Sequence, residues 1–325
     1  MYTEKYHDID LSECNFLITG GAGFIGSNLV QYLLKHNAGK VRVLDNLSNG
    51  YKKNIEEFID NKRFEFVEGD IRDFETCRNA LKDIHYVSHQ AALGSVPRSI
   101  KDPVTSNSVN IDGFLNMLTA VKDEPRVRRM VYAASSSTYG DSKSLPKTEG
   151  EEGAPLSPYA VTKLVNELYA DVFSRVYGLH TLGLRYFNVF GPKQSPDNPY
   201  AAVIPLFIKA AREGRSPSIF GDGLTSRDFT FVENVIQANV KGMLLNSLPK
   251  HEVINVACGE RNSLIRIWEI LKEISGNVSD PIFSEERAGD IKISLASIDK
   301  AFRLIGYKPT VYFEEGLKYT YEVAT

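Results

Sequence analysis

A glycine-rich loop between an apolar run and a helical pattern, near the start of the chain, is the feature that most constrains the fold. Residues 16–19 read Phe-Leu-Ile-Thr and lead directly into Gly20-Gly-Ala-Gly23-Phe-Ile-Gly26, after which apolar residues recur with helical spacing. In such a loop Gly20 permits a tight turn, Gly23 lets the backbone approach a pyrophosphate, and Gly26 lets strand and helix pack closely. The loop therefore predicts a parallel α/β sheet whose first crossover binds a dinucleotide.

Short apolar runs alternate with longer helical patterns through the first half of the chain, which is typical of repeated βαβ units. The expected strands are 16–19, 41–45, 64–68, 86–89, 130–134 and 181–186. The expected helices are 24–36, 74–81, 104–121 and 159–177. Their order predicts an α/β fold with a doubly wound parallel sheet of the Rossmann type.

The regular alternation ends near residue 188, where Gly-Pro, Asn-Pro and Gly-Asp-Gly sequences separate shorter segments. Three further helices are expected, at 204–213, 232–245 and 264–274. We expect residues 1–187 to form the dinucleotide-binding domain, with segments near 230–258 returning to it. Residues 188–325 are expected to form mainly a smaller, substrate-binding lobe over the carboxyl edge of the sheet.

Charge and cysteine content exclude several classes of protein. The 325 residues include 38 Lys and Arg against 41 Asp and Glu, a net charge of −3, so we expect no nucleic-acid partner held by bulk positive charge. The three cysteines, Cys14, Cys77 and Cys258, lack the spacing of a zinc site or a disulfide framework, so we expect no metal and a cytoplasmic protein. No apolar stretch approaches about 18 residues, so membrane insertion is not expected.

A carboxylate at the end of the second expected strand indicates which dinucleotide binds. Asp45 lies 19 residues after Gly26, where it can bind the ribose hydroxyls of an adenosine. Asn46 and Ser48 follow it, with no Arg or Lys placed for a 2′-phosphate, and Arg42 lies inside the strand. The sequence therefore predicts NAD rather than NADP.

A second carboxylate follows the third expected strand, in the sequence Gly-Asp-Ile-Arg-Asp at 69–73. Asp70 could reach the amino group of the adenine. The alternative role, capping the helix that begins near residue 74, belongs more naturally to Asp73.

Tyr159 and Lys163 stand at positions i and i+4 of an expected helix and hence on one face of it. A free tyrosine has a pKa of about 10, so a phenolate near neutral pH requires roughly 4 kcal/mol of stabilisation. The Lys163 ammonium and the positive ring of NAD could supply it in a poorly solvated cleft. Tyr159 would then remove a proton from a substrate hydroxyl, and either Ser135 or Ser136 would hydrogen-bond the same oxygen.

Together these motifs resemble those of the extended short-chain dehydrogenase/reductase family, and within it the UDP-hexose 4-epimerases. The likeness spans nearly the whole chain. Besides the loop and the Tyr-Lys pair it includes 69–73, 89–92, 185–192 and 227–229. The segments Ala-Leu-Gly-Ser-Val-Pro-Arg-Ser-Ile at 92–100 and Ala-Ala-Ser-Ser-Ser-Thr-Tyr-Gly at 133–140 are similar to those of bacterial UDP-N-acetylglucosamine 4-epimerases of surface-polysaccharide pathways.

The resemblance implies a tightly held NAD that accepts a hydride and returns it within one turnover, and a 4-keto sugar that rotates about its diphosphate. The implied cofactor contacts lie on the glycine loop and at strand ends: Gly20, Gly23, Phe24, Ile25, Gly26, Asp45, Asn46, Ser48, Gly50, Asp70, Ile71, Gln90, Ala91, Ala92, Tyr159, Lys163 and Val189. The implied UDP-sugar contacts are Gly94, Ser95, Ser135, Ser136, Tyr159, Asn188, Ala202, Val203, Arg227, Arg261, Arg287, Asp290 and Ser294. The resemblance also implies a homodimer formed through the helices at 104–121 and 159–177.

One position bears on the choice of sugar. Ser294 matches a position that some family members fill with a bulky tyrosine, which restricts the sugar pocket. A small side chain there leaves space for an N-acetyl group, so the sequence favours UDP-GlcNAc and UDP-GalNAc. Volume alone does not exclude plain UDP-glucose or the uronic acids.

Two groups of alternatives remain. A sugar-nucleotide 4,6-dehydratase would carry an Asp-Glu pair, and a UDP-glucuronate decarboxylase commonly a Glu, where this chain has Ser-Ser-Thr-Tyr at 136–139. These lyases therefore rank below an epimerase. A non-catalytic NAD-binding sensor is the alternative from another class, and the intact Tyr159 and Lys163 argue against it.

Overall fold

A seven-stranded parallel sheet forms the centre of the protein. The computed structural model describes residues 1–197, 200–245, 248–276, 279–285 and 292–324. Strand order in the sheet is β11-β6-β5-β4-β1-β2-β3, and every adjacent pair is parallel. The strands are β1 (Asn15–Thr19), β2 (Lys40–Asp45), β3 (Phe64–Glu68), β4 (Tyr86–His89), β5 (Arg129–Ser135), β6 (Thr181–Tyr186) and β11 (His251–Val256). The order reverses between β1 and β4, so the predicted doubly wound α/β fold is confirmed.

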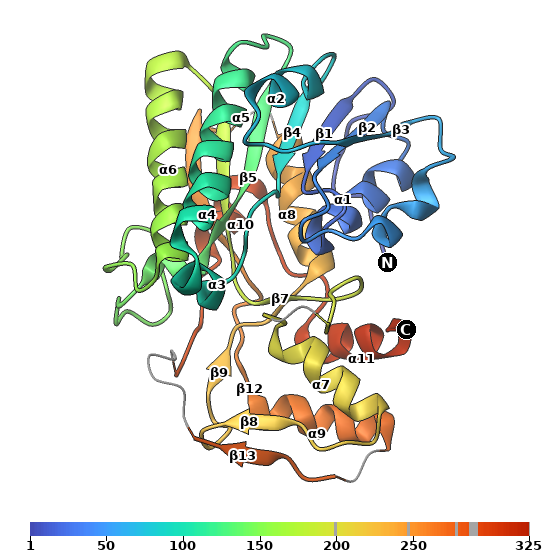
Figure 1. The fold of residues 1–325 in the computed structure, drawn as a ribbon, viewed down its shortest axis with the longest axis vertical. Coiled ribbons are helices and arrows are strands. Elements are labelled where there is room, and N and C mark those ends of the chain that lie inside the picture. The colour runs from blue at the N-terminus through green and yellow to red at the C-terminus, as the bar shows by residue number, and fades with distance from the viewer. Residues whose placement is uncertain (198–199, 246–247, 277–278, 286–291, 325) are drawn as a thin grey trace.

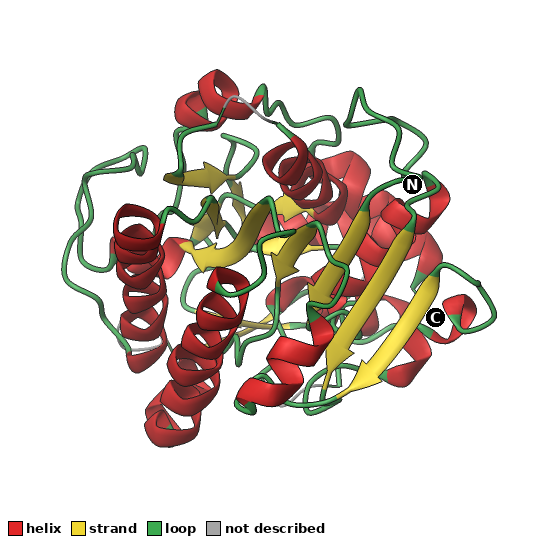
Figure 2. Cartoon of the chain, turned by 90° about the horizontal axis from the view of Figure 1, so that it is seen from above, coloured by secondary structure: helices red, strands yellow, loops and turns green. Residues whose placement is uncertain are grey.

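Helices cover both faces of this sheet (Figure 2) because side chains alternate along each strand. In β1, Phe16 and Ile18 join the core under α1 (Phe24–Lys35) and α8 (Val232–Leu244). Leu17, between them, faces the opposite core with α2 (Phe74–Ala80), α5 (Gly113–Lys122) and α6 (Pro158–Tyr177). Strands buried on both sides explain the continuous apolar runs of the sequence.

The expected helix at 104–121 is not one regular helix. It follows a short helix, α3 (Val96–Lys101), and consists of α4 (Pro103–Asn107), a π-helical segment η3 (Ser108–Asp112) and α5. The π segment turns Asn110 inward, where its Oδ1 accepts from Leu93 N at 2.8 Å and its Nδ2 donates to Thr162 Oγ1 at 3.1 Å. A π segment inserted into a helix re-aims one side chain, and here it ties the helix to α6.

A smaller lobe lies beyond the carboxyl ends of the strands, at the bottom of Figure 1. Its helices α7 (Val203–Arg212) and α9 (Leu264–Ser275) pack together, with the rings of Phe207 and Trp268 edge to face at 6.1 Å. Short strand pairs border them: β8 (Ser218–Phe220) with β13 (Ile282–Ser284), and β9 (Ser226–Arg227) with β12 (Asn262–Ser263). Near the junction lie β7 (Val189–Phe190), β10 (Thr230–Phe231), α10 (Asp299–Ile305) and α11 (Phe313–Val323).

The chain returns from the smaller lobe to the sheet. Helix α8 packs on β4, β5 and β6, and β11 adds the seventh strand beside β6. The remaining short 3-10 helices are η1 (Lys52–Asn54), η2 (Glu56–Phe58) and η4 (Ser136–Tyr139). Among the described residues no helix combines the length and apolar character needed to cross a membrane.

Candidate active site

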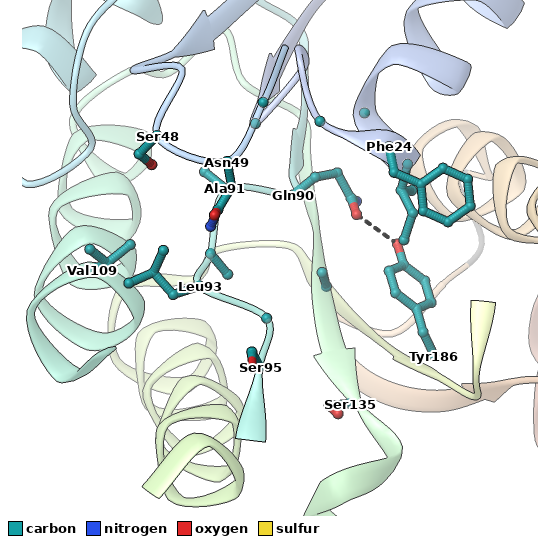
Figure 3. Close-up of a pocket in the computed structure, with 18 of the residues that line it drawn as sticks. Phe24, Ser48, Asn49, Gln90, Ala91, Leu93, Ser95, Val109, Ser135 and Tyr186 are labelled. Atoms are coloured by element: carbon teal, nitrogen blue, oxygen red, sulfur yellow. Dashed lines mark hydrogen bonds between the residues drawn. The ribbon is translucent and has the colours of Figure 1, made fainter. Parts of the chain in front are cut away.

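A pocket of about 570 Å³ opens at the carboxyl ends of the strands, and Figure 3 shows part of its lining. It is lined by every residue predicted to contact the cofactor, by both candidate serines, and by Gly94, Ser95 and Asn188 of the predicted sugar contacts. Its lining also includes residues that the sequence did not single out: Leu44, Asn49, Gly69, Leu93, Val96, Arg98, Val109, Ala133, Ala134, Ser137, Tyr186, Gln194 and Tyr200. Segments far apart in the sequence therefore meet in one cavity.

The glycine loop forms one end of this pocket and admits no larger residue at two positions. Gly20 has φ +68°, and a Cβ there would lie 2.7 Å from the backbone nitrogen of Ala91. A Cβ at Gly26 would lie 2.3 Å from the carbonyl oxygen of Gly20. Gly23 begins α1, and no side chain of the described residues caps this helix. The first-turn N–H groups and the helix dipole therefore face the pocket, which fits the pyrophosphate of a dinucleotide.

Asp45 is held in place at the end of β2. Its Oδ2 accepts from Ala22 N at 2.9 Å and its Oδ1 from Leu47 N at 2.8 Å. Burial raises the pKa of Asp45, and these two backbone hydrogen bonds lower it. A Cβ at Gly50 would lie 3.0 Å from the same Oδ2, so the loop packs tightly on the carboxylate. This geometry fits a group that accepts hydrogen bonds from ribose hydroxyls.

The Arg42 side chain bonds groups outside the pocket. Its Nη1 donates to the carbonyls of Ala80 and Lys82 at 2.8 Å each, and its Nη2 pairs with Glu65 Oε2 at 2.9 Å. The guanidinium is therefore not placed for a 2′-phosphate. The donor set around Asp45 agrees with NAD.

Asp73 caps α2, as the sequence pattern indicates, whereas the contact of Asp70 with the adenine stays a prediction. Asp70 lines the pocket, accepts from Asn46 Nδ2 at 2.9 Å and pairs with Arg72 at 2.7 Å. The hydrogen bond from Arg72 is the main reason that the pKa of Asp70 falls to about 2. Asp73 caps α2 by accepting from Glu75 N at 3.1 Å. Only Asp70 is thus presented to a ligand.

Tyr159 and Lys163 enter the pocket from the first turns of α6. The helix begins where Ser157 Oγ accepts from Ala160 N at 3.1 Å, with Pro158 in the first turn. Lys163 is 4% exposed; its Nζ donates to Ala133 O at 2.7 Å and lies 6.0 Å from the centroid of the Tyr159 ring. Helical spacing alone brings these two side chains together, as the sequence predicts.

Burial is the largest electrostatic effect on both groups. It raises the pKa of Tyr159, against a hydrogen bond with Ser135 that lowers it. It also lowers the pKa of Lys163 to about 8, against the carboxylate of Glu167, which raises it. The sequence assigns the lowering of the Tyr159 pKa to Lys163 and the positive ring of NAD together, and this stays a prediction; among the protein's own groups, desolvation outweighs the hydrogen bond with Ser135. A phenolate requires a further positive charge in the pocket.

Of the two candidate serines, Ser135 has the hydrogen bond with Tyr159. Ser135 is the last residue of β5, and its Oγ also bonds Ser137 N at 3.1 Å and Ser137 Oγ at 2.9 Å. Thr138 Oγ1 donates to the carbonyl of Ser135 at 2.8 Å. Ser136 lines the same pocket from the next turn. The hydroxyl-rich sequence thus folds into a tight turn that orients Ser135.

A polar chain behind the pocket was missed by the sequence reasoning. Tyr186 donates to Gln90 Oε1 at 3.2 Å (Figure 3) and accepts from Asn239 Nδ2 at 2.9 Å. Ser88 Oγ donates to Asn239 Oδ1 at 3.0 Å. Burial raises the pKa of Tyr186 to about 12, so this phenol stays neutral. Its place at the end of a strand in the 185–192 motif was the only available signal.

Arg98 lines the same pocket. Its Nη2 donates to Asn49 Oδ1 at 2.9 Å, and its guanidinium carbon lies 5.1 Å from the ring centroid of Tyr200. These partners lie in the loop after β2 and at the edge of the smaller lobe, so their meeting is a tertiary contact that sequence spacing does not indicate.

Other predicted sugar contacts lie in the smaller lobe. Arg261 lines a second cavity of about 400 Å³, and Ser294 N donates to Ser226 O, on the rim of that cavity, at 3.1 Å. Arg227 ends β9, while Ala202 and Val203 begin α7. None of these predicted contacts is among the residues that line the Tyr159 pocket. Arg287 and Asp290 lie outside the described residues.

Known proteins are similar to this chain over nearly its whole length. Residues 16–257 match the model of the NAD dependent epimerase/dehydratase family. A UDP-N-acetylglucosamine 4-epimerase from Methanobrevibacter ruminantium, solved with UDP-N-acetylmuramic acid, is 40% identical, with a TM-score of 0.89 over 95% of this chain and 97% of that one. A UDP-glucuronic acid 4-epimerase from Bacillus cereus, solved with UDP-glucuronic acid and NAD, is 34% identical, with a TM-score of 0.86 over 95% and 98%.

A third relative is the UDP-glucose 4-epimerase of Mycolicibacterium smegmatis, which is 34% identical over 94% of this chain and 97% of its own length. The likeness therefore extends through both lobes and includes the elements that build the pocket. The chain belongs to the NAD-dependent epimerase/dehydratase family and is an NAD-dependent enzyme of the epimerase class.

Proposed function

We propose that this enzyme is a UDP-N-acetylglucosamine 4-epimerase, which interconverts UDP-GlcNAc and UDP-GalNAc through a 4-keto sugar. The observation that carries the proposal is one pocket in which Tyr159, Lys163 and Ser135 meet the glycine loop and Asp45. This set of groups suits a reversible oxidation of a secondary alcohol. Bound NAD supplies a hydride acceptor that returns the hydride within the same turnover.

The side chains of this protein then have separate tasks. Tyr159 removes the proton of the C4 hydroxyl and returns it after the sugar has turned. Ser135 shares the reacting oxygen and passes the proton to the phenolate, while Ser136 lines the same wall. Lys163 adds positive charge below the phenol and is anchored on Ala133 O. A positioned acid–base group of this kind contributes about 10²- to 10⁴-fold in rate.

Inversion at C4 requires that the nucleotide be held firmly and the hexose loosely. Arg227 and Arg261 of the smaller lobe are proposed to bind the diphosphate, because a guanidinium can contact two phosphate oxygens at once. Asn188, whose Nδ2 donates to Asp228 O at 3.1 Å, would contact the nucleotide sugar from the pocket side. A Cβ at Gly94 would meet no heavy atom within 4 Å, so space beside this loop is open for the sugar to rotate.

The N-acetyl preference is proposed from the small side chain of Ser294, which leaves the volume that a bulky residue would fill. The 40% identity to the epimerase from Methanobrevibacter ruminantium supports the same choice. The lyase alternatives lack support in the turn after β5, since residues 136–139 offer hydroxyl groups and no carboxylate.

The substrate proposal is tested by incubating the enzyme separately with UDP-GlcNAc, UDP-glucose and UDP-GlcNAcA and identifying each product. We expect UDP-GalNAc from UDP-GlcNAc with the highest kcat/KM of the three, and retention of deuterium placed at C4. A higher kcat/KM for another sugar would correct the substrate. Loss of water or carbon dioxide, or exchange of the C4 label with solvent, would refute the epimerase.

We also propose a homodimer formed along α6. Leu168, Val172 and Val176 recur every four residues on this helix and are 58%, 41% and 63% exposed. Ile100 of α3 and Val104 of α4, on helices that pack against α6, are 64% and 77% exposed. An apolar stripe of this extent on a water-soluble enzyme is typical of an interface between subunits.

A further inference from the structure

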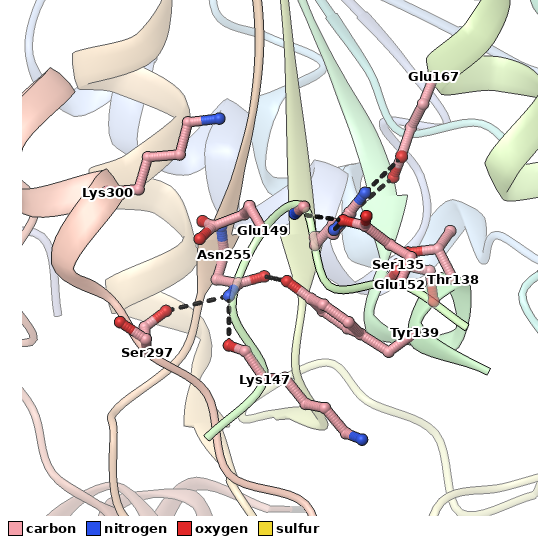
Figure 4. A network of polar contacts seen from close by, with 12 residues as sticks. Ser135, Thr138, Tyr139, Lys147, Glu149, Glu152, Glu167, Asn255, Ser297 and Lys300 are labelled. Carbon is pink, nitrogen blue, oxygen red and sulfur yellow. Dashed lines mark hydrogen bonds and ion pairs between the residues drawn. The ribbon is translucent and has the colours of Figure 1, made fainter. Parts of the chain in front are cut away.

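A set of charged side chains connects α6 to the end of β6, and Figure 4 labels two of them, Glu167 and Glu152. Arg185 of β6 donates from Nε to Glu167 Oε1 at 2.9 Å and from Nη2 to Glu167 Oε2 at 2.7 Å. Its third nitrogen, Nη1, pairs with Glu152. The side chains of Arg185 and Glu167 are 5% and 8% exposed, whereas that of Glu152 is 24% exposed. One guanidinium is thus shared between two carboxylates.

This network is placed against both halves of the reacting site. Glu167 follows Lys163 by four residues on α6, so the two lie on the same face of the helix. Arg185 is the cross-strand partner of Ala134, beside Ser135 at the end of β5. Its guanidinium carbon also lies 4.9 Å from the ring centroid of Tyr139, in the turn that follows Ser135.

Fold stability alone does not account for this arrangement. The desolvation energy lost when an ion pair is buried is roughly equal to the energy gained from the attraction between its charges. Apolar side chains could therefore join α6 to β6 with similar stability. With Lys163 included, the group has two positive and two negative charges and is neutral. Without Glu167, Arg185 would still pair with Glu152, and the group of buried charges would carry one uncompensated positive charge beside Lys163.

We propose that Glu167, held by Arg185, is a positioning residue whose negative charge stabilises the Lys163 ammonium beside Tyr159, while Ala133 O anchors the Lys163 side chain. The inference rests on the proposed 4-epimerase function, in which Lys163 must carry its charge. Glu167 touches neither substrate nor cofactor in this proposal and acts only through Lys163. Glu152 completes the charge balance of Arg185 but lies farther from the reacting groups.

Within the part of the chain that the structure describes, few other charges act on Lys163. Tyr159 faces it from α6, and His89 faces it from β4. Burial lowers the pKa of His89 to about 3, with the charge of Lys163 as the smaller cause, so this imidazole is neutral. Glu167 is the group whose charge raises the pKa of Lys163 against its burial.

Of the described residues, few charged groups act on Glu167 as well. Arg185 from β6, Lys163 from α6 and Glu152 from the preceding loop act on its carboxylate. The charge of Glu167 also acts on the phenol of Tyr132 in β5. Burial raises the pKa of this phenol well above its ordinary value, so Tyr132 is neutral. Removing the charge of Glu167 should therefore lower the pKa of Lys163 below about 8.

The test compares Glu167→Gln with the matched control Glu152→Gln, since both substitutions remove one carboxylate from the same guanidinium. In Glu167→Gln we expect the alkaline limb of the kcat/KM profile to move down by about one pH unit, with a fall in kcat of about fivefold near pH 8 and little change in KM. In Glu152→Gln the limb should stay within about 0.3 units of the parent. Glu167→Asp keeps the negative charge, so its alkaline limb should lie close to that of the parent enzyme.

A second readout does not depend on turnover. Pulse labelling with acetic anhydride across a pH series, read by mass spectrometry of the peptide that contains Lys163, reports the pKa of this amine directly. Glu167→Gln should label at lower pH than the parent and Glu152→Gln should not. Midpoints of thermal unfolding, measured on all variants, identify any that fail to fold, and Glu167→Asp then carries the comparison.

Equal alkaline limbs and equal labelling curves for Glu167→Gln and Glu152→Gln would overturn the proposal and leave Glu167 a structural residue. That result differs from failure of the proposed function, which would be seen instead as an active Tyr159→Phe variant. If Tyr159→Phe is inactive and the two Gln variants behave alike, only the role of Glu167 is wrong.

Discussion

At the scale of single residues, the reaction is concentrated on one phenol. Tyr159→Phe removes the group that exchanges the proton and should lower kcat by about 10³-fold while NAD remains bound. Tyr186→Phe is the matched control, because it removes a phenol hydroxyl from the same pocket. This hydroxyl bonds Gln90 and Asn239, so kcat of the variant should fall by less than about tenfold. Rates come from product analysis, and bound NAD from the absorbance released on denaturation.

The opposite ranking, with Tyr186→Phe the less active variant, would contradict the assignment of Tyr159.

Tyr159 also illustrates why position in a helix is informative. Its spacing from Lys163 follows from 3.6 residues per turn, which the sequence displays directly. Its pKa, in contrast, depends on burial by several elements, and here burial moves it upward.

The glycine loop makes a second prediction at this scale. Gly26→Ala places a Cβ 2.3 Å from the carbonyl oxygen of Gly20, so either the helix or the loop must shift. We expect about 1–3 kcal/mol of lost stability and a clear fall in the NAD that copurifies. Gly94→Ala is the control, since its Cβ would meet open space; it should keep the parent's NAD content. Unchanged NAD in Gly26→Ala would refute the loop as the pyrophosphate site.

At the scale of elements, Asp228 joins three segments between the two lobes. It is fully buried; its Oδ1 accepts from Cys258 N at 2.9 Å, and its Oδ2 from Gly259 N at 3.1 Å and Ala296 N at 3.2 Å. Burial is the largest effect and raises the pKa of Asp228 to about 7, although these hydrogen bonds lower it. An unfolded aspartate has a pKa of about 3.9.

Between those two values the folded protein binds a proton at Asp228 that the unfolded chain has lost. The free energy of unfolding should therefore fall as pH rises from about 4 to about 7, by up to about 4 kcal/mol from this group. Asp228→Asn should remove that part of the slope, measured by urea unfolding across this pH range. Asp73→Asn, an exposed cap that asparagine can replace, should keep the parent's slope. An unchanged slope in Asp228→Asn would contradict the prediction.

Regular elements were largely predictable and their irregular parts were not. Strands 64–68, 86–89 and 181–186 occur where the apolar runs place them. The expected helix at 104–121 contains a π segment, in which Asn110 bonds Leu93 of a loop and Thr162 of α6. The spacing of apolar residues predicts where a regular helix lies. It does not predict a π segment, because that irregularity depends on contacts with other elements of the fold.

At the scale of the whole molecule, the proposed dimer predicts a change of mass. Val172→Glu places a charge in the middle of the exposed apolar stripe on α6 and should give a monomer, because desolvating that charge in an interface costs several kcal/mol. Phe302→Glu is the control: Phe302 is 60% exposed but lies on α10, outside the stripe, and its variant should keep the parent's mass. Light scattering after size exclusion measures both. A parent of monomer mass, or a Val172→Glu variant that stays dimeric, would refute this interface.

The sequence by itself determined the features that depend on neighbours along the chain. The strand–glycine–helix succession, the carboxylate of Asp45 and the Tyr159–Lys163 spacing follow from local backbone geometry and from side-chain periods of two and 3.6 residues. These were sufficient for the α/β fold and for NAD.

Only the tertiary structure decided which distant residues share the pocket and its electrostatics. Arg185 reaches Glu167 and Glu152 from another element, Tyr186 joins Gln90 from a strand 96 residues away, and β11 returns to the sheet after the smaller lobe. The physical reason is that these contacts are selected by burial and charge balance in the assembled fold, and no period along the chain encodes them.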